Sequence, residues 1–79
     1  MARLVSLGYE NNVNADKIIA IVSSSAAPSK RAVKNAKEKN MLVDATNGNK
    51  ASAVIIMESG HVITSALKAE TIKKRTSEF

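Results

Sequence analysis

The chain has 79 residues, of which 44% are apolar, and a net charge of +5 from twelve Lys and Arg against seven Asp and Glu. This length predicts a single domain spanning residues 1–79, which buries only about 60% of the surface that its unfolded state exposes. The absence of cysteine excludes a disulfide framework, thiolate catalysis and cysteine-based zinc sites, and it fits the reducing cytoplasm.

Membrane and secretion signals are not evident in the sequence. No apolar run approaches the roughly 20 residues of a membrane span. No run near the N-terminus is long enough for the apolar core of a signal peptide. We therefore expect a cytoplasmic protein without a membrane partner.

The positive charge is concentrated in two segments. Residues 27–40 contain five basic residues and one acid, a net +4, and residues 67–79 contain four basic residues and two acids, a net +2. The other residues sum to −1. A local excess of this kind indicates a polyanionic partner or an acidic surface.

The first part of the chain predicts two strands separated by a turn. Residues 4–9 alternate apolar and small side chains until Gly8, which predicts a strand, and residues 10–14 are typical of a turn. Residues 17–22 are apolar on both alternating faces. We therefore expect the second strand to be covered on both sides.

A helix is predicted for residues 28–40. Pro28 suits its first turn, because the missing N–H would have no helical partner there. Lys30, Lys34 and Lys37 fall on one side of this helix, and small side chains fall on another. The small side chains are Ser29, Ala32, Val33 and Ala36. This narrow inner face predicts close packing.

A hairpin is predicted in the middle of the chain. Residues 42–46 and residues 53–57 are rich in strand-forming side chains. Asn47 and Gly48 between them are a strong hairpin signal, because both residue types tolerate positive φ. We expect the two strands to pair with each other.

The remaining elements complete the predicted fold class, α+β. Ser59 and Gly60 make a tight turn into a strand over residues 61–67, and a short basic helix follows over residues 69–75. The second half is then an antiparallel meander. The prediction is a small, mostly antiparallel sheet of about five strands, with one main helix after strand two and a short C-terminal helix.

Both faces of the predicted sheet are apolar. Ile18 and Val22 face opposite to Ile19 and Ile21, and residues 53–57 alternate in the same way. One helix with a narrow face and a short terminal helix cannot cover two such faces, and large exposed apolar patches mark interaction surfaces. We therefore expect a homo-oligomer in which neighbouring subunits cover the remainder.

Candidate catalytic groups are few. His61 is the only histidine, and beside a turn it is typical of a solvated strand end. Asp44 is more typical of a residue that holds a turn around Thr46 to Gly48 through hydrogen bonds. Residues 24–30 resemble a phosphate loop but lack its glycines. An enzyme would depend on Asp44 and His61 alone, so we expect a non-enzymatic protein without metal, cofactor or small-molecule substrate.

The composition narrows the expected nucleic acid to a duplex. Readers of single strands and RNA stack unpaired bases on aromatic rings, and Tyr9 and Phe79 are the only aromatic residues. Contacts to a duplex backbone need Lys, Arg and small polar groups instead. Lys50 at the predicted hairpin tip and Lys17 at a strand edge are candidates, whereas the helix lysines are more typical of a solvated face.

These residues resemble the RemA-like regulators of bacterial extracellular-matrix genes from about residue 4 to about residue 75. The most specific match is the string of residues 42–46, followed by Gly48 and residues 53–57. The other matching positions are Leu7, Gly8, Tyr9, Ile18, Ile19, Ile21, Val22, Ser23, Ala27, Pro28, Lys30, Arg31, His61, Val62, Ile63, Glu70 and Thr71.

The resemblance implies a transcriptional regulator of matrix and biofilm genes that assembles into a closed ring and bends double-stranded DNA around its rim. The DNA contacts of the family map to Lys17, at the start of the second predicted strand, and to Asn49 and Lys50, after the glycine of the tip. Pro28, at the start of the helix, is also tied to DNA binding in the family. A ring would cover the exposed apolar face.

The tip departs from the family pattern. The family typically has two adjacent arginines and a third shortly after, where this chain has Asn49, Lys50 and Ser52, and Lys17 also replaces an arginine. Lysine loses the bidentate hydrogen bonding of arginine, and Asn49 carries no charge, so we expect weaker DNA binding per subunit. The alternative is an oligomeric scaffold that binds an acidic protein partner and has weak or lost DNA binding.

Overall fold

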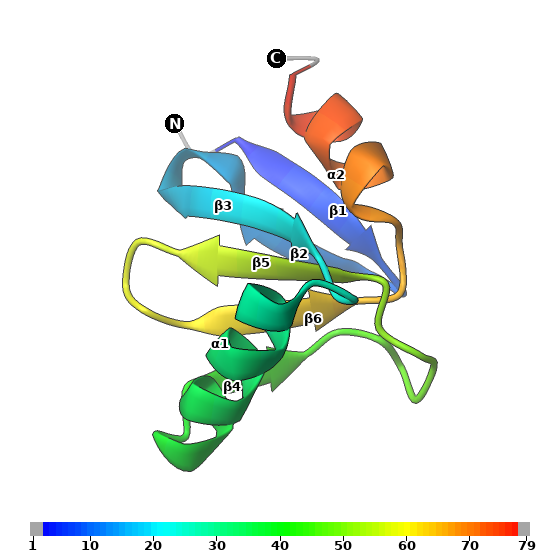
Figure 1. Ribbon diagram of the computed structural model, residues 1–79. Coiled ribbons are helices and arrows are strands. Elements are labelled where there is room, and N and C mark those ends of the chain that lie inside the picture. The colour runs from blue at the N-terminus through cyan, green and yellow to red at the C-terminus, as the bar shows by residue number, and fades with distance from the viewer. Residues whose placement is uncertain (1–2, 78–79) are drawn as a thin grey trace.

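The computed structural model describes residues 3–77 and contains six strands, two α-helices and one 3₁₀ turn (Figure 1). The strands form a two-stranded ribbon and a four-stranded sheet. The predicted α+β class is confirmed, with six strands in two sheets in place of about five in one.

The ribbon consists of β1 (Leu4–Gly8) and β2 (Asn11–Asn14), which pair antiparallel. The two residues between them have φ angles of 52° and 64°, as a type I′ hairpin turn requires. The prediction of a turn over residues 10–14 is therefore wrong from residue 11 onward. β2 has a single apolar side chain, Val13, so the sequence shows no alternation of apolar and polar residues that would predict a strand. The Val13 side chain is nevertheless buried in the core.

The four-stranded sheet begins with β3 (Ile18–Ser23), which follows the 3₁₀ turn η1 (Ala15–Lys17). β3 pairs antiparallel with β5 (Ala53–Met57), and β5 pairs antiparallel with β6 (Val62–Ser65). The strands predicted at these three places are confirmed, and the last is shorter than the predicted residues 61–67.

The fourth strand, β4 (Leu42–Asp44), pairs parallel with β6 and not with β5, so the sheet order is β3-β5-β6-β4. The predicted hairpin and the meander that includes it are therefore wrong. Asn47 and Gly48 do have positive φ, 54° and 81°, but residues 45–52 form a loop that carries the chain past β6. A turn sequence controls only local geometry, whereas a helical crossover from β3 aligns β4 in parallel with β6.

That crossover is α1 (Ala27–Glu38), which has a proline in its first turn and packs against β4 and β6. Ser29 and Ala36 on its inner face are buried, as the narrow small-residue face predicts. The C-terminal helix α2 (Ala69–Thr76) packs against β1 and β3 through the fully buried Ile72. Both helices lie close to their predicted positions.

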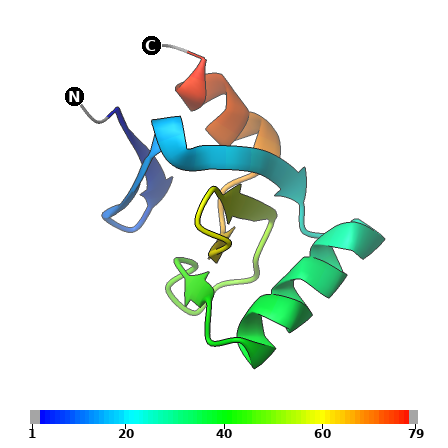
Figure 2. The same cartoon turned by 90° about the vertical axis from the view of Figure 1, so that its left-hand side faces the viewer.

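The core consists of two apolar clusters on opposite faces of the sheet. The ribbon and α2 cover one face and α1 covers the other (Figure 2). β5 is consequently buried on both faces, with Ile55 and Val54 at 0% and 1% exposure. The chain does cover both faces of its sheet, contrary to the sequence prediction, because β2 contributes Val13 to the layer over one of them.

Among residues 3–77, four large apolar side chains stay exposed after folding. They are Leu4, Tyr9, Ile19 and Val43. Ile19 lies at a register shift in β3, one edge strand of the sheet, and Val43 lies in β4, the other edge strand. The exposed apolar side chains therefore lie at the two edges of the sheet and on the ribbon, where Leu4 begins β1 and Tyr9 follows it, and not across a whole face of the sheet.

Candidate nucleic-acid interface

The loop of residues 45–52 is organised by Asp44 at the end of β4. One oxygen of its carboxylate accepts hydrogen bonds from the backbone N–H and hydroxyl of Thr46, at 3.0 and 2.6 Å, and from the hydroxyl of Thr64 at 3.1 Å. The Thr46 bonds, helped by Thr64, hold the pKa of Asp44 below its usual value. Asp44 thus holds the turn at Thr46, as the sequence indicates.

Asn49 fixes the same loop to the ribbon. Its side-chain amide donates to the Tyr9 hydroxyl at 2.8 Å and to the Thr46 carbonyl at 3.0 Å, and its backbone N–H donates to that carbonyl at 3.0 Å. Tyr9 lies 40 residues away in sequence, so no local pattern indicates this contact. Asn49 is therefore engaged within the chain, while the next side chain, Lys50, is exposed.

The segment that precedes α1 is hydrogen-bonded to this loop. The Ser24 hydroxyl donates to the Ala51 carbonyl at 2.8 Å, and the Ser24 N–H donates to the Ser52 carbonyl at 3.1 Å. Pro28 stands exposed in the first turn of α1, four residues after Ser24. Three of the predicted DNA contacts, at positions 28, 49 and 50, are thus brought to the end of the sheet where β3 ends and β5 begins. The loop between β4 and β5 projects on the right in Figure 1.

Lys17 lies at the opposite end of β3. Six strand residues separate it from Ser24, a distance of about 20 Å. Its ammonium is 3.7 Å from a carboxylate oxygen of Glu58, and its carbonyl accepts the Glu58 N–H at 2.7 Å. Within one chain, Lys17 is therefore separate from the other three predicted residues and has a carboxylate beside it.

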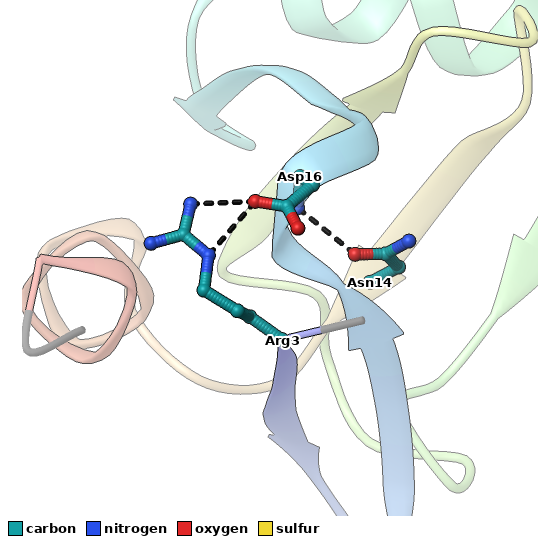
Figure 3. A network of polar contacts seen from close by, with 3 residues as sticks. All are labelled: Arg3, Asn14 and Asp16. Atoms are coloured by element: carbon teal, nitrogen blue, oxygen red, sulfur yellow. Dashed lines mark hydrogen bonds and ion pairs between the residues drawn. The ribbon is translucent and has the colours of Figure 1, made fainter. Parts of the chain in front are cut away.

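A second ion pair near this end involves Arg3, at the start of the ribbon. Its guanidinium lies 2.6 Å from Asp16, whose backbone N–H donates to the Asn14 side chain at 3.0 Å (Figure 3). These contacts connect the start of β1 to η1. Neither ion pair found within residues 3–77 involves a residue of α1, whose basic side chains all lie in solvent.

Residues 4–76 match the family model described as extracellular matrix regulatory protein A-like, or RemA-like. The chain belongs to the RemA-like family. It is 51% identical to a Brevibacillus brevis protein over 73 residues, which cover 92% of this chain and 85% of that one.

Two further relatives extend the comparison. A Lachnoclostridium phytofermentans protein is 47% identical over 78 residues, covering 99% of this chain and 86% of its own length. A Bacillus cytotoxicus protein is 52% identical over 73 residues, covering 92% and 84%. All three relatives are named as regulatory proteins. The resemblance found in the sequence is thus confirmed at the level of the family.

An open hollow of this RemA-like chain lies away from the loop, at the Lys17 end of the sheet. It has a volume of about 660 Å³, with Val43, Met57 and Ile63 contributing apolar lining. The remaining lining residues are Asn14, Lys17, Glu58, Ser59 and His61. An open apolar hollow with a charged rim is suited to receive a side chain of another molecule.

The two candidate catalytic groups are not brought together. Asp44 bonds to Thr64 near the end of β6, whereas His61 precedes that strand, is exposed, and hydrogen-bonds to the Ser59 hydroxyl at 2.7 Å. Among residues 3–77 there is no group of three or more His, Asp or Glu side chains able to hold a metal ion. The helices within the same range are too short or too polar to cross a membrane.

Proposed function

We propose that this RemA-like protein is a DNA-binding transcriptional regulator that acts as a ring-shaped homo-oligomer and bends duplex DNA. In this proposal it is not an enzyme, and it controls extracellular-matrix and biofilm genes. The observation that carries the proposal is the family match over residues 4–76 in a chain of net charge +5.

The position of Lys50 supports the proposed contact with DNA. Its side chain projects from a loop that Asp44 and Asn49 hold in one shape, so little further ordering of the backbone is needed on binding. An ammonium group of this kind neutralises a phosphate without reading sequence. One such contact per subunit is weak, and repetition around a ring would make it effective.

The edges of the sheet support the proposed self-association. Ile19 on β3 is 66% exposed and Val43 on β4 is 47% exposed, and the two strands form opposite edges. Apolar groups on opposite sides of a subunit suit head-to-tail contacts, which close into a ring when the rotation permits. In such a ring, Lys17 of one subunit and Lys50 of another can follow the same strand of DNA.

A salt-titrated binding assay tests the proposal. The full chain is mixed with labelled duplex DNA, single-stranded DNA or an acidic polypeptide, and affinity is measured between 50 and 200 mM salt. We expect a preference for the duplex and a logarithmic salt slope of about −0.9 for each phosphate neutralised. Lys17→Ala combined with Lys50→Ala should weaken duplex binding and flatten that slope by one to two units per contacting subunit.

Asn49→Arg is the matched gain-of-charge variant in the same assay. It restores a charge that the family typically has at this position, so duplex affinity should increase although the contact with Tyr9 is lost. An unchanged affinity in the Lys17 and Lys50 double variant at moderate salt would show that these lysines do not face DNA.

The second candidate function is an oligomeric scaffold for an acidic protein partner. The internal hydrogen bonds of Asn49 favour this function. At this predicted DNA contact the chain has an uncharged side chain that stabilises the loop, in place of a charged side chain that could bind phosphate. Tight binding of the acidic polypeptide, together with no duplex binding at 50 mM salt, would establish this function in place of the first.

A further inference from the structure

We infer that the solvent side of α1 is a second DNA-backbone contact, formed by the α1 lysine stripe, which consists of Lys30, Lys34 and Lys37. This inference rests on the proposed function, because it names the same partner. It assigns a DNA contact to charges for which the sequence favours a solvated face of the helix.

The stripe follows from the period of the helix. The three lysines recur at intervals of four and three residues, which places them on one side of a helix with 3.6 residues per turn. They span about 10 Å of the axis at 1.5 Å per residue. A duplex presents one negative charge for every 1.7 Å or so of its axis, so all three ammonium groups can reach phosphates at once.

The charge of the stripe is not neutralised by the folded chain. All three side chains are exposed, and Arg31 beside them is exposed as well. The two ion pairs within residues 3–77 join other residues of the chain. Since α1 has a single acid, Glu38, at its last residue, the helix presents a net positive surface to solvent.

The stripe is continuous with the proposed DNA-binding loop. The two Ser24 hydrogen bonds attach the entrance of α1 to residues 51 and 52, immediately after Lys50. Lys30 lies in the first turn of α1, at the end of the molecule that carries this loop. A duplex in contact with Lys50 can therefore continue along α1, and the added contacts offset the charge that is lacking at Asn49.

The C-terminal helix provides the comparison. Lys68, Lys73 and Lys74 are also exposed, but α2 packs on the opposite side of the molecule from α1 (Figure 2). Arg75 of the same helix donates to the Ser6 carbonyl at 3.1 Å, so this arginine connects α2 to β1. Three lysines can thus be removed either from α1, or from α2 together with its N-cap residue Lys68, with the same change in net charge.

The test compares two triple variants of the full chain. Lys30→Gln, Lys34→Gln and Lys37→Gln form the stripe variant, and Lys68→Gln, Lys73→Gln and Lys74→Gln form the control. Glutamine has a helix propensity close to that of lysine, and thermal unfolding of both variants should match the parent. Binding to a mixed-sequence duplex is measured by fluorescence anisotropy from 50 to 200 mM salt.

We expect the stripe variant to bind at least tenfold more weakly at 100 mM salt and to lose two to three units of salt slope per contacting subunit, about 0.9 for each phosphate released. The control should retain most of the affinity. Equal losses in both variants would overturn the inference, because net charge alone would then explain them. An unchanged slope in the stripe variant, while Lys50→Ala weakens binding, would also overturn it and leave the proposed function intact. Failure of the parent chain to bind duplex DNA at 50 mM salt would instead refute the proposed function.

Discussion

Asn49 and Asp44 show how single side chains shape the proposed contact surface. Asn49 uses its amide within the chain, on Tyr9 and Thr46, and Asp44 accepts three hydrogen bonds at the start of the same loop. Lys50 beside them is left to solvent. The polar residues of this loop therefore hold its shape, and the adjacent lysine supplies its charge.

Asp44 should make the stability of the protein depend on pH. Its pKa is lowered in the folded state by the Thr46 and Thr64 hydrogen bonds, so folding favours the charged form. This stabilisation is complete above the ordinary value of 3.8 and is lost as the pH falls through the lowered folded value. Asp44→Ala should cost about 1 kcal/mol at pH 7, since the side chain is exposed and each bond contributes modestly.

Urea unfolding of the parent and Asp44→Ala between pH 7 and pH 2.5 measures this effect. The difference in the free energy of unfolding should stay constant down to about pH 5 and then shrink. Asp44→Asn is the control, because it retains an acceptor oxygen without titrating. A difference that is the same at pH 7 and pH 2.5 would contradict the assignment.

The ribbon differs more than any other element from its sequence prediction, because β2 is a strand where the sequence predicts a turn. β2 contributes one buried side chain to the core, that of Val13, which packs in the same cluster as Val5 and Leu7. β4 is a second case, because its partner is selected by the crossover through α1 and not by the turn that follows it. Both strands are short, and their pairing depends on distant parts of the chain.

Val13→Ala tests whether the ribbon is a stabilising layer. The side chain is 6% exposed, and removing two buried methyl groups should cost about 2 kcal/mol. For a domain of this size, that lowers the midpoint of thermal unfolding by about 8 to 16 °C at matched protein concentration. Asn12→Ala, at an exposed position of the same strand, should change the midpoint by only a few degrees. Equal midpoints for the two variants would exclude a packing role for β2.

At the scale of the whole molecule, the chain forms three layers, with the sheet between the ribbon and α2 on one side and α1 on the other (Figure 2). Both apolar clusters are enclosed by the chain itself. We therefore expect self-association to bury the exposed apolar side chains at the sheet edges and the hollow beside Val43.

Light scattering after size-exclusion chromatography measures this self-association. The parent should elute at a mass several times that of one chain at micromolar concentration, and Val43→Glu should shift it toward the monomer, because a charge would be buried at the contact. Asn12→Glu adds the same charge on the outer face of the ribbon and should leave the mass unchanged. A parent chain that is monomeric at this concentration would rule out the proposed ring.

The sequence by itself determined the α+β class, the family, both helices and the strands rich in apolar residues, since these depend on local composition and period, on Pro28 and on a continuous match. Only the tertiary structure decided that β2 exists and that β4 joins β6. It also decided that Lys17 and Lys50 lie at opposite ends of β3. The physical reason is that pairing between strands and burial of a lone side chain such as Val13 depend on contacts between residues far apart in the chain. Local preferences do not encode such contacts, as the Asn47-Gly48 turn without a hairpin demonstrates.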